Sequence, residues 1–376
     1  MHQNEHALTA KNKCLAPEIM RRVVFVGVSP ASQGGVAAVL KSYKQNIEPF
    51  QMIESTCDGS KFIKILFLLT AFFKLLFFRI KGCKIAHIHS SSYNSFKRKR
   101  LLINYARHLG YKVIFHLHGG EFHQFVRQYG KKRIKKTLDK CSKIIVLSPS
   151  WKSFFARTLQ INDTYIVNNI VPKPILSSSP TEKNKLHLTF LGYIGDHKGV
   201  FDLLTVLAND KAFYRNKVLL TAGGNGESKR LIDFIEKNDL HDTVKYAGWI
   251  SGAAKEQLLQ STDIYLLTSY NEGLPISILE AMSFHIPVIT TPVGGIKDLV
   301  KHERNGLLVT PGDHSELDKA LKRMIADASL RKQIAENNAV DIQEFFSEKV
   351  FTQLQKIYVD LLRDEKSSTC GNQIKI

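Results

Sequence analysis

The feature that most constrains this chain is a repeated alternation of short apolar runs with longer segments of helical period. In residues 21–176 the runs are VVFVGV, KIAHIH, KVIFHLH, KIIVLS and TYIVNN, and segments such as GGVAAVLKSYKQNI separate them. The pattern restarts after residue 185 with LHLTFLG, KVLLTAGG, TVKYAGW, DIYLLTS, IPVITT and NGLLVTP. Val-rich and Ile-rich runs separated by helices are typical of βαβ units with parallel strands. The sequence therefore predicts an α/β fold.

The length of 376 residues exceeds what one hydrophobic core usually supports and fits two domains. The polar run SSSPTEKNK at residues 177–185 has the composition of a linker. Residues 1–20 lack the apolar stretch of a secretory signal, and MRRVVFVG at Met20 is similar to a second natural start. The predicted organisation is a polar leader (1–20), an N-terminal domain (21–176), the linker (177–185), a C-terminal domain (186–345), a closing helix (346–364) and a loose tail (365–376).

Cysteine usage and charge narrow the class of protein. The five cysteines are scattered without a C-x-x-C pair, which argues against a disulfide framework or a structural zinc site and favours a cytoplasmic protein. Residues 1–185 contain 31 Lys and Arg against 9 Asp and Glu, whereas residues 186–376 contain 22 against 25. A basic field confined to one half predicts an anionic partner there, either nucleic acid or an acidic membrane surface.

One apolar stretch stands apart, KFIKILFLLTAFFKLLFFRIKGCK at residues 61–84. Lys64, Lys74 and Arg79 interrupt it, and a membrane span needs about 20 apolar residues. Three readings stay open: a buried helix, an amphipathic helix on anionic lipid, or a span. The basic runs FKRKR (96–100) and KKRIKK (131–136) favour the lipid surface over the solvated face that a charge run usually marks.

The window Tyr270–Val300 is the most informative about chemistry. Pro275 stands where a helix would begin, after the strand-like run DIYLLTS. A helix start presents backbone N–H groups and a positive dipole end to an anion. Glu272 precedes this helix and Glu280 lies within it, which suits a ligand with an anionic middle and hydroxyl-bearing ends, such as a nucleotide sugar. On spacing alone, Glu272 could equally be a cap and Glu280 a surface residue.

The surrounding motifs resemble the donor-binding signature of the retaining glycosyltransferases of family 4. The similarity includes EGLPISILEAM, PVITTPVGGI, NGLLVTPGD, FLGYIGDHKGVFDLL, AGGNGE and YAGW, and in the first half GGVAAVL, HIHSSS, HLHGGEF and VNNIV. The resemblance implies a GT-B fold, in which two Rossmann-like domains face each other across a cleft. The second domain would hold the donor and the first the acceptor.

The resemblance also implies roles for individual residues. Lys198 of the Lys-Gly motif would contact the donor diphosphate and stabilise its charge as it leaves. Glu272 would bind the donor sugar and Glu280 the ribose, and His118 would contact the reacting sugar from the first domain. The predicted catalytic set is His118, Glu272 and Lys198. The predicted donor-binding set is Gly34, Gly35, Gly192, Tyr193, Lys198, Glu272, Gly273, Leu274, Pro275, Ile276, Ser277 and Glu280.

Two positions depart from the family pattern. Tyr193 occupies the place of an arginine, so a charge-assisted contact worth about 1.5 to 3 kcal/mol is missing or replaced by a hydroxyl. His197 or Arg230 could compensate for the lost cation. His285 replaces a glycine in the turn before the run IPVITT, where it would alter only a loop.

In the first half, glycines and histidines are the candidate site residues. Gly34 and Gly35 open a helix after the first strand, where they form either a phosphate-binding loop or a tight turn. His87 and His89 alternate along one run, as do His116 and His118 along another, so that each pair faces one side of the sheet. Without acidic or cysteine partners these pairs argue against a metal site, and we expect core packing for His87 and His116.

The chain contains no Asp-x-Asp, the metal and diphosphate motif of the other large glycosyltransferase architecture. We therefore expect no cofactor and a metal-independent enzyme that takes a nucleotide diphosphate sugar as co-substrate. The basic, apolar first half predicts a lipid-linked or growing polysaccharide acceptor and a peripheral position on the cytosolic membrane face. The alternatives are a nucleotide-sugar epimerase or phosphorylase of the same architecture, or a basic nucleic-acid-binding module, for which no recognisable motif exists.

Overall fold

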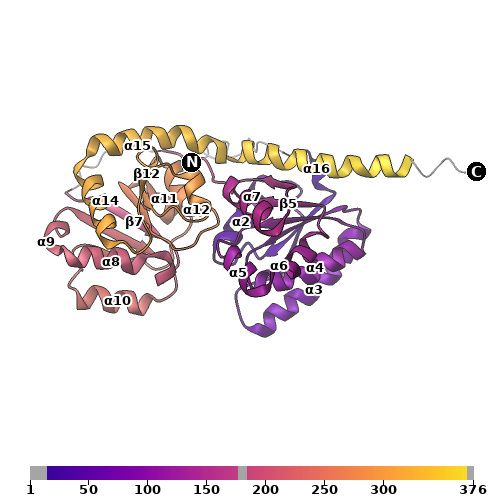
Figure 1. The fold of residues 1–376 in the computed structure, drawn as a ribbon, viewed down its shortest axis with the longest axis horizontal. Coiled ribbons are helices and arrows are strands. Elements are labelled where there is room, and N and C mark those ends of the chain that lie inside the picture. The colour runs from indigo at the N-terminus through magenta and orange to yellow at the C-terminus, as the bar shows by residue number, and fades with distance from the viewer. Residues whose placement is uncertain (1–14, 177–183, 371–376) are drawn as a thin grey trace, which may run out of the picture. The chain divides into compact units, whose positions relative to one another are not determined.

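The computed structural model describes residues 15–176 and 184–370, which form two compact units (Figure 1). The first unit contains the chain up to Ile170 and again from Phe346, and the second contains Val171–Phe345. Each unit is built on one six-stranded sheet with helices on its faces. The predicted α/β class with two Rossmann-like domains is confirmed.

Parts of the predicted organisation lie outside the described residues. These parts are residues 1–14 of the leader, 177–183 of the linker and 371–376 of the tail. The leader also contains the short helix α1 (Pro17–Met20). The closing helix α16 (Ser347–Cys370) continues beyond residue 364, where the sequence predicted its end.

The sheet of the first unit has the strand order β2-β1-β3-β4-β5-β6, and every neighbouring pair is parallel. Its strands are β1 (Val23–Val28), β2 (Met52–Thr56), β3 (Ile85–Ser90), β4 (Lys112–Leu117), β5 (Lys143–Val146) and β6 (Thr164–Ile166). Its helices are α1, α2 (Gly35–Asn46), α3 (Lys61–Ile80), α4 (Asn94–His108), α5 (Phe122–Tyr129), α6 (Lys131–Leu138), α7 (Pro149–Phe154) with a π-helical turn at Phe155–Leu159, and α16.

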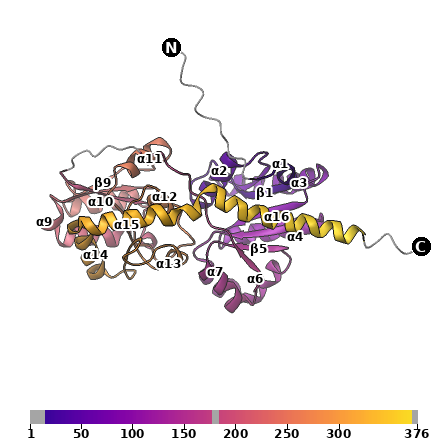
Figure 2. The same cartoon turned by 90° about the horizontal axis from the view of Figure 1, so that it is seen from above.

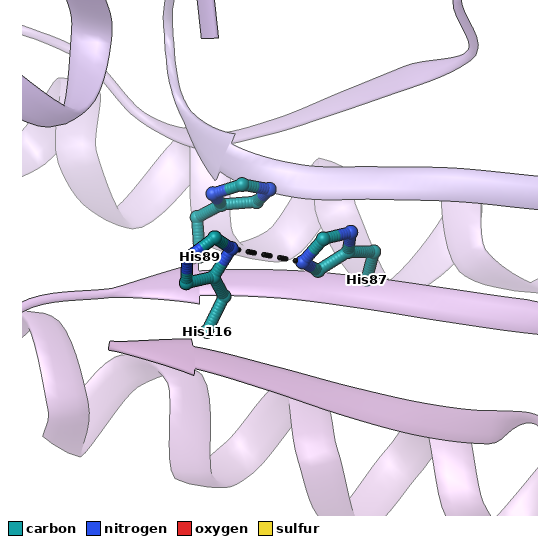
Figure 3. Close-up of side chains that lie close together, drawn as sticks. All are labelled: His87, His89 and His116. Carbon is teal, nitrogen blue, oxygen red and sulfur yellow. Dashed lines mark hydrogen bonds between the residues drawn. The ribbon is translucent and has the colours of Figure 1, made fainter. Parts of the chain in front are cut away.

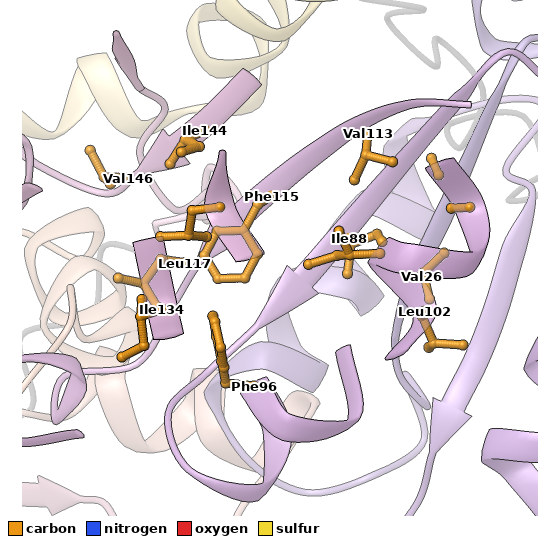
Figure 4. Close-up of a cluster of buried hydrophobic side chains, with 14 of the residues drawn as sticks. Val26, Ile88, Phe96, Leu102, Val113, Phe115, Leu117, Ile134, Ile144 and Val146 are labelled. Atoms are coloured by element: carbon orange, nitrogen blue, oxygen red, sulfur yellow. The ribbon is translucent and has the colours of Figure 1, made fainter. Parts of the chain in front are cut away.

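The two faces of this sheet differ in chemistry because successive side chains point to opposite sides of a strand. One face carries aliphatic and aromatic residues that form a buried core with α3 to α7 (Figure 4). The opposite face carries buried histidines of β3 and β4, which Tyr43 of α2 and Tyr358 of α16 contact. Helix α16 lies along this side of the unit (Figure 2). The predicted facing of the histidine pairs is confirmed.

Helix α3 leaves most of its apolar surface uncovered. Of its residues only Ala71 and Leu75 are fully buried. The exposed apolar side chains, which we call the α3 surface, are Phe62, Ile63, Ile65, Leu66, Leu69, Phe73, Leu76, Phe77 and Ile80. A buried core helix is therefore the wrong reading for most of this stretch. Among the described residues, no helix combines the length and apolar character that crossing a membrane requires.

One of the predicted cationic runs is only partly on the surface. In FKRKR, which lies at the start of α4, Lys97 is exposed but Lys99 is only 2% exposed. The Lys99 ammonium donates to the Ser55 hydroxyl, and burial lowers the pKa of Lys99 to about 7. The run therefore supplies fewer surface cations than its sequence implies. In KKRIKK the residues Lys131, Lys132, Arg133 and Lys136 are exposed.

The sheet of the second unit has the order β12-β11-β10-β7-β8-β9, again with parallel neighbours. Its strands are β7 (Leu186–Leu191), β8 (Val218–Gly223), β9 (Val244–Tyr246), β10 (Ile264–Leu267), β11 (Val288–Thr290) and β12 (Gly306–Leu308). Its helices are α8 (Val200–Asn209), α9 (Lys211–Tyr214), α10 (Ser228–Lys237), α11 (Ala253–Gln260), α12 (Ile276–Ser283), α13 (Ile296–Leu299), α14 (His314–Ala326) and α15 (Ala328–Asp341), with 3₁₀ turns at Asp196–Lys198 and Ile342–Phe345.

Candidate active site

The strand order of the second unit brings Lys198 and Glu272 together. Lys198 ends the 3₁₀ turn that follows β7, and Glu272 lies in the loop that follows β10. Because β7 and β10 are parallel neighbours, both loops leave the same edge of the sheet. The Lys198 ammonium lies 2.5 Å from Glu272 Oε1, and the Ser269 hydroxyl donates to the same oxygen at 2.8 Å. The two residues that the family resemblance assigns to the diphosphate and the sugar therefore form one ion pair.

This ion pair is largely shielded from water, since the Glu272 side chain is 9% exposed and the Lys198 side chain 22%. Removing either partner would leave a poorly solvated charge unpaired. An anionic ligand can pair with Lys198 in place of Glu272 only if polar groups of that ligand then hydrogen-bond to the Glu272 carboxylate. Sugar hydroxyls are such groups. The pair therefore favours a ligand that carries both an anion and hydroxyl donors.

Glycines and threonines of the motif TTPVGG hold the Glu272 loop in place. Thr291 Oγ1 donates to the Ser269 carbonyl at 2.5 Å, and the Gly295 N–H donates to the Gly273 carbonyl at 2.8 Å. Gly294 has a φ of +55°, and a Cβ there would stand 1.7 Å from the Glu272 carbonyl oxygen. Only glycine permits this approach. The resemblance in this motif thus has a physical basis, because the motif supports the carboxylate.

Helix α12 begins beside this loop. Pro275 is its N-cap residue, so the helix begins one residue later than predicted, and no side chain caps it. The first N–H groups of a helix have no intrahelical acceptor, so those of Ile276 and Ser277 can serve an anion. Leu274 is buried, and the Ser277 side chain is a hydrogen-bond partner of Tyr265.

Glu280, which lies within α12, forms a second ion pair that the sequence analysis did not predict. Its carboxylate accepts from the Lys255 ammonium of α11, and the two side chains are 14% and 27% exposed. The sequence around Lys255 gives no sign of this role, because a lysine in an ordinary amphipathic helix has no distinctive spacing.

Tyr193, at the position of the family arginine, lies against the glycine loops. Its side chain is close to Gly195 and Gly226, where an added Cβ would approach the tyrosine ring to 2.9 and 2.8 Å. Its ring centroid is 5.2 Å from that of His197.

Arg230 is engaged elsewhere, with Asp196 at 2.8 Å and Glu227 at 2.7 Å. Arg230 therefore does not stand free to replace the lost arginine. Gly192 precedes Tyr193 at the end of β7.

The remaining predicted residues belong to the first unit. Gly34, with a φ of +112°, caps α2, and Gly35 begins the helix. A Cβ on either glycine would meet no atom within 4 Å, so the loop is open at this point. His118 follows β4, and its Nε2 lies 2.8 Å from Nδ1 of the buried His89.

His118 is one member of a group of four stacked imidazoles. His87, His89 and His116 offer ring nitrogens that all lie within 4.8 Å of one another (Figure 3). Burial is the main cause that lowers the pKa of each ring, to about 3 for His87 and about 4 for His118, and well below the ordinary value for His89 and His116. The sequence did not predict that the two pairs meet in one cluster.

Comparison with known proteins shows which families and proteins the chain resembles. Residues 174–340 match the family described as glycosyl transferases group 1. N-acetyl-alpha-D-glucosaminyl L-malate synthase of Bacillus anthracis is 30% identical over 190 residues, which are 50% of this chain and 48% of that protein. An N,N'-diacetylbacillosaminyl-diphospho-undecaprenol alpha-1,3-N-acetylgalactosaminyltransferase of Campylobacter jejuni is 27% identical over 171 residues, 45% of this chain and 43% of that protein. The matched segments therefore span about half of each relative or less.

Among solved structures, Anabaena HepE in complex with UDP and glucose superimposes with a TM-score of 0.72 at 18% identity, over 90% of this chain and 99% of that one. The two Rossmann-like units, each built on a parallel six-stranded sheet, and the superposition on HepE define the GT-B class of fold. The segment that matches glycosyl transferases group 1, residues 174–340, lies within the second unit.

The buried histidines predict that the first unit loses stability in weak acid. Their pKa values are lowered in the folded state, so below about pH 6.5 the unfolded chain binds protons that the folded chain does not. Each such histidine should cost about 1.4 kcal/mol of unfolding free energy per pH unit as the pH falls from about 6.5 towards its folded pKa.

The two tryptophans allow each unit to be followed separately, since Trp151 lies in the first unit and Trp249 in the second. We expect denaturant unfolding of a Trp249→Phe variant to shift strongly between about pH 7.5 and about pH 5.5, and that of a Trp151→Phe variant to shift much less. Equal pH dependence of the two signals would contradict the neutral state of the histidine cluster.

Proposed function

We propose that the protein is a retaining glycosyltransferase of the family 4 type, which moves a hexose-type sugar from a nucleotide diphosphate sugar to an acceptor hydroxyl. The observation that carries this proposal is the ion pair of Lys198 and Glu272 beside the start of α12. It places a cation, a carboxylate and free helix N–H groups within one loop cluster. These groups match the charge and hydroxyl pattern of a nucleotide sugar.

In the proposed mechanism the donor separates the ion pair. Lys198 turns to the diphosphate and, with the first N–H groups of α12, stabilises the charge that develops as the diphosphate leaves. Glu272 then accepts hydrogen bonds from sugar hydroxyls, and Glu280 accepts from the ribose. His118 contributes a contact to the reacting sugar from the first unit.

The transfer step exchanges one bond for another at the anomeric carbon. Its bond to the diphosphate oxygen breaks, the acceptor oxygen bonds to the same face, and the configuration is kept. The acceptor proton passes to the departing diphosphate oxygen, which becomes more basic as its bond to carbon breaks. The protein's part is to hold the partners and to stabilise charge.

The relatives support this class of substrates. The HepE complex holds UDP and glucose, so a uridine diphosphate hexose is the first donor to test. The name of the Campylobacter relative specifies a diphospho-undecaprenol acceptor, which supports a lipid-linked saccharide here. An epimerase or phosphorylase would differ by turning over donor without an acceptor hydroxyl or by releasing a sugar phosphate.

Glu272→Gln and Lys198→Ala should each lower turnover by about two orders of magnitude or more, because each change removes a charge at the reacting end. Initial rates with donor and acceptor, together with circular dichroism of the folded variants, measure this. Arg215→Gln is the control, since Arg215 pairs with Asp242 on an exposed surface of the same unit. Near-normal turnover in folded Glu272→Gln would remove the central assignment.

A chelator should change the transfer rate little, because Lys198 and the α12 start supply the positive charge at the diphosphate. The rate is measured in buffer that contains an excess of a strong chelator, before and after added Mg²⁺. Complete loss of activity that Mg²⁺ reverses would show that the proposed metal-independent mechanism is wrong.

We further propose that the first unit binds the anionic cytosolic face of a membrane through the α3 surface. The side chains of Phe62 and Phe73 are 77% and 74% exposed, which water disfavours. Residues 61–84 contain lysines and an arginine but no acidic residue. Helix α3 packs against α4, and α4 packs against α6 with its exposed lysines. Apolar side chains with basic neighbours fit an acidic lipid surface.

This surface predicts salt-sensitive binding to anionic vesicles. The double variant Phe62→Gln and Phe73→Gln should stay folded and lose most vesicle binding, since both side chains are exposed. Changing Lys131 and Lys132 to Gln should weaken binding by about 1 kcal/mol per lysine. Sedimentation with anionic and neutral vesicles measures both effects.

The matched control is Val340→Gln, which removes an apolar side chain that is 65% exposed on the second unit. It should sediment like the unmodified protein, and every variant should keep its activity on a short soluble acceptor. Equal binding to neutral and anionic vesicles, or binding to neither, would overturn the membrane proposal.

A further inference from the structure

The two loops that carry the ion pair of the second unit are also joined by contacts that do not involve its charges. The Thr268 hydroxyl donates to the Gly199 carbonyl at 2.9 Å, and the Tyr270 N–H donates to the His197 carbonyl at 3.0 Å. The backbones approach so closely that a Cβ on Gly199 would stand 2.2 Å from the Thr268 carbonyl oxygen. Since these contacts flank Lys198 on both sides, the two loops pack as one assembly.

The Tyr270 side chain adds a contact to helix α8. Its hydroxyl donates to Oδ2 of Asp202 at 3.0 Å. Asp202 belongs to α8, which begins just after the turn that carries Lys198. His314, the first residue of α14, places its Nε2 3.0 Å from the other carboxylate oxygen, Oδ1. Because α14 also packs against α8, two helices hold the carboxylate that Tyr270 contacts.

The loop that carries Glu272 is thus attached on two sides. On the β11 side, residues of the motif TTPVGG bond to its backbone. On the β7 side, Tyr270 bonds to the Lys198 turn and to α8. In the proposed complex the donor separates Lys198 from Glu272, so the ion pair no longer fixes the distance between the two loops. The contacts of Tyr270 remain, because neither of its partners belongs to the ion pair.

The hydroxyl contact is the stronger of the two contacts that Tyr270 makes. A hydrogen bond to a carboxylate is roughly twice as strong as one between neutral groups, such as the backbone bond to His197. The Asp202 side chain is 21% exposed and Tyr270 is 39% exposed, so water competes with this bond only in part. Much of what holds the loop against α8 therefore depends on Asp202.

We propose that Asp202 is a positioning residue, which holds the Glu272 loop against α8 through the Tyr270 hydroxyl after a donor has separated the ion pair. This role rests on the proposed function, in which Glu272 accepts hydrogen bonds from the donor sugar. Asp202 contacts neither the sugar nor the diphosphate. It preserves the distance between Glu272 and Lys198, which bind two parts of one ligand, and such a ligand binds well only where that distance is already set.

Amide hydrogen exchange of the full chain without ligand tests the contact itself. Tyr270→Phe removes the donor hydroxyl, and Asp202→Leu removes the acceptor. Each change should raise the exchange rate of the amide at position 270, which donates to His197, by about tenfold, because the loop opens more often. The matched control is Tyr214→Phe, since Tyr214 donates to Asp318 at 2.7 Å in the same unit. Unchanged exchange in both Tyr270→Phe and Asp202→Leu would overturn the proposal.

Ligand affinity separates positioning from a purely structural contact. UDP-glucose carries the sugar that Glu272 would hold, whereas UDP lacks it. Calorimetry of Tyr270→Phe should show that the affinity for UDP-glucose falls by about tenfold and that for UDP by less than about threefold. Tyr214→Phe should bind both ligands like the unmodified protein. An equal loss for both ligands in folded Tyr270→Phe would show a structural contact and overturn the positioning role.

Two further comparisons test whether Tyr270 acts through Asp202. Asp202→Asn keeps an oxygen that accepts from the tyrosine hydroxyl, so it should retain most of the UDP-glucose affinity that Asp202→Leu loses. The double variant Asp202→Leu with Tyr270→Phe should lose no more than either single variant, because both changes remove the same hydrogen bond. Additive losses, or an Asp202→Asn variant as weak as Asp202→Leu, would contradict the role of Asp202.

The outcomes distinguish this inference from the proposed function. Faster exchange at position 270 with unchanged UDP-glucose affinity would remove the positioning role and leave the transferase assignment in place. An unmodified protein that binds neither UDP nor UDP-glucose would contradict the proposed donor and, with it, this role, even where the exchange rates change as expected.

Discussion

Parallel strand pairing is the constraint on which the candidate site depends. In both described sheets every neighbouring strand pair is parallel, so each strand delivers its following loop to the same edge. That edge gathers Lys198 and Glu272 in the second unit, and it gathers His118 with the segment after β6 in the first. Residues 74 positions apart in the chain thus come within one ion pair. Tight glycine contacts then fix the loops, so the site is formed largely by backbone geometry.

The charged side chains of the candidate site form ion pairs with one another. Lys198 neutralises Glu272, and Lys255 neutralises Glu280, although in the proposed complex both carboxylates face hydroxyl groups. A half-buried ion pair of this kind keeps both side chains in defined positions at a modest net cost. In the proposed complex, ligand binding exchanges these partners, so an anion that lacks hydroxyl groups is disfavoured.

The sequence predicts the fold well because the spacing of apolar residues and the residues that form turns are local properties of the chain. Eleven of the strand regions were visible as Val-rich and Ile-rich runs, whereas β2, with the sequence MIEST, was missed because its residues are mostly polar. Lys99 was misread as a surface cation because its burial against Ser55 depends on the packing of α4 on the sheet. The Lys255 pair and the meeting of four histidines arise from strand order, which no short motif encodes.

The central claim is that the second unit binds a nucleotide diphosphate sugar through Lys198 and Glu272. Thermal unfolding of the Trp151→Phe variant with a panel of nucleotide diphosphate sugars tests it most directly, because Trp249 then reports on the second unit alone. At about 100 times its dissociation constant, the correct donor should stabilise this unit by about 2.7 kcal/mol, and Lys198→Ala should abolish most of that gain. No stabilisation by any member of the panel, or equal stabilisation of the Lys198→Ala variant, would contradict the account.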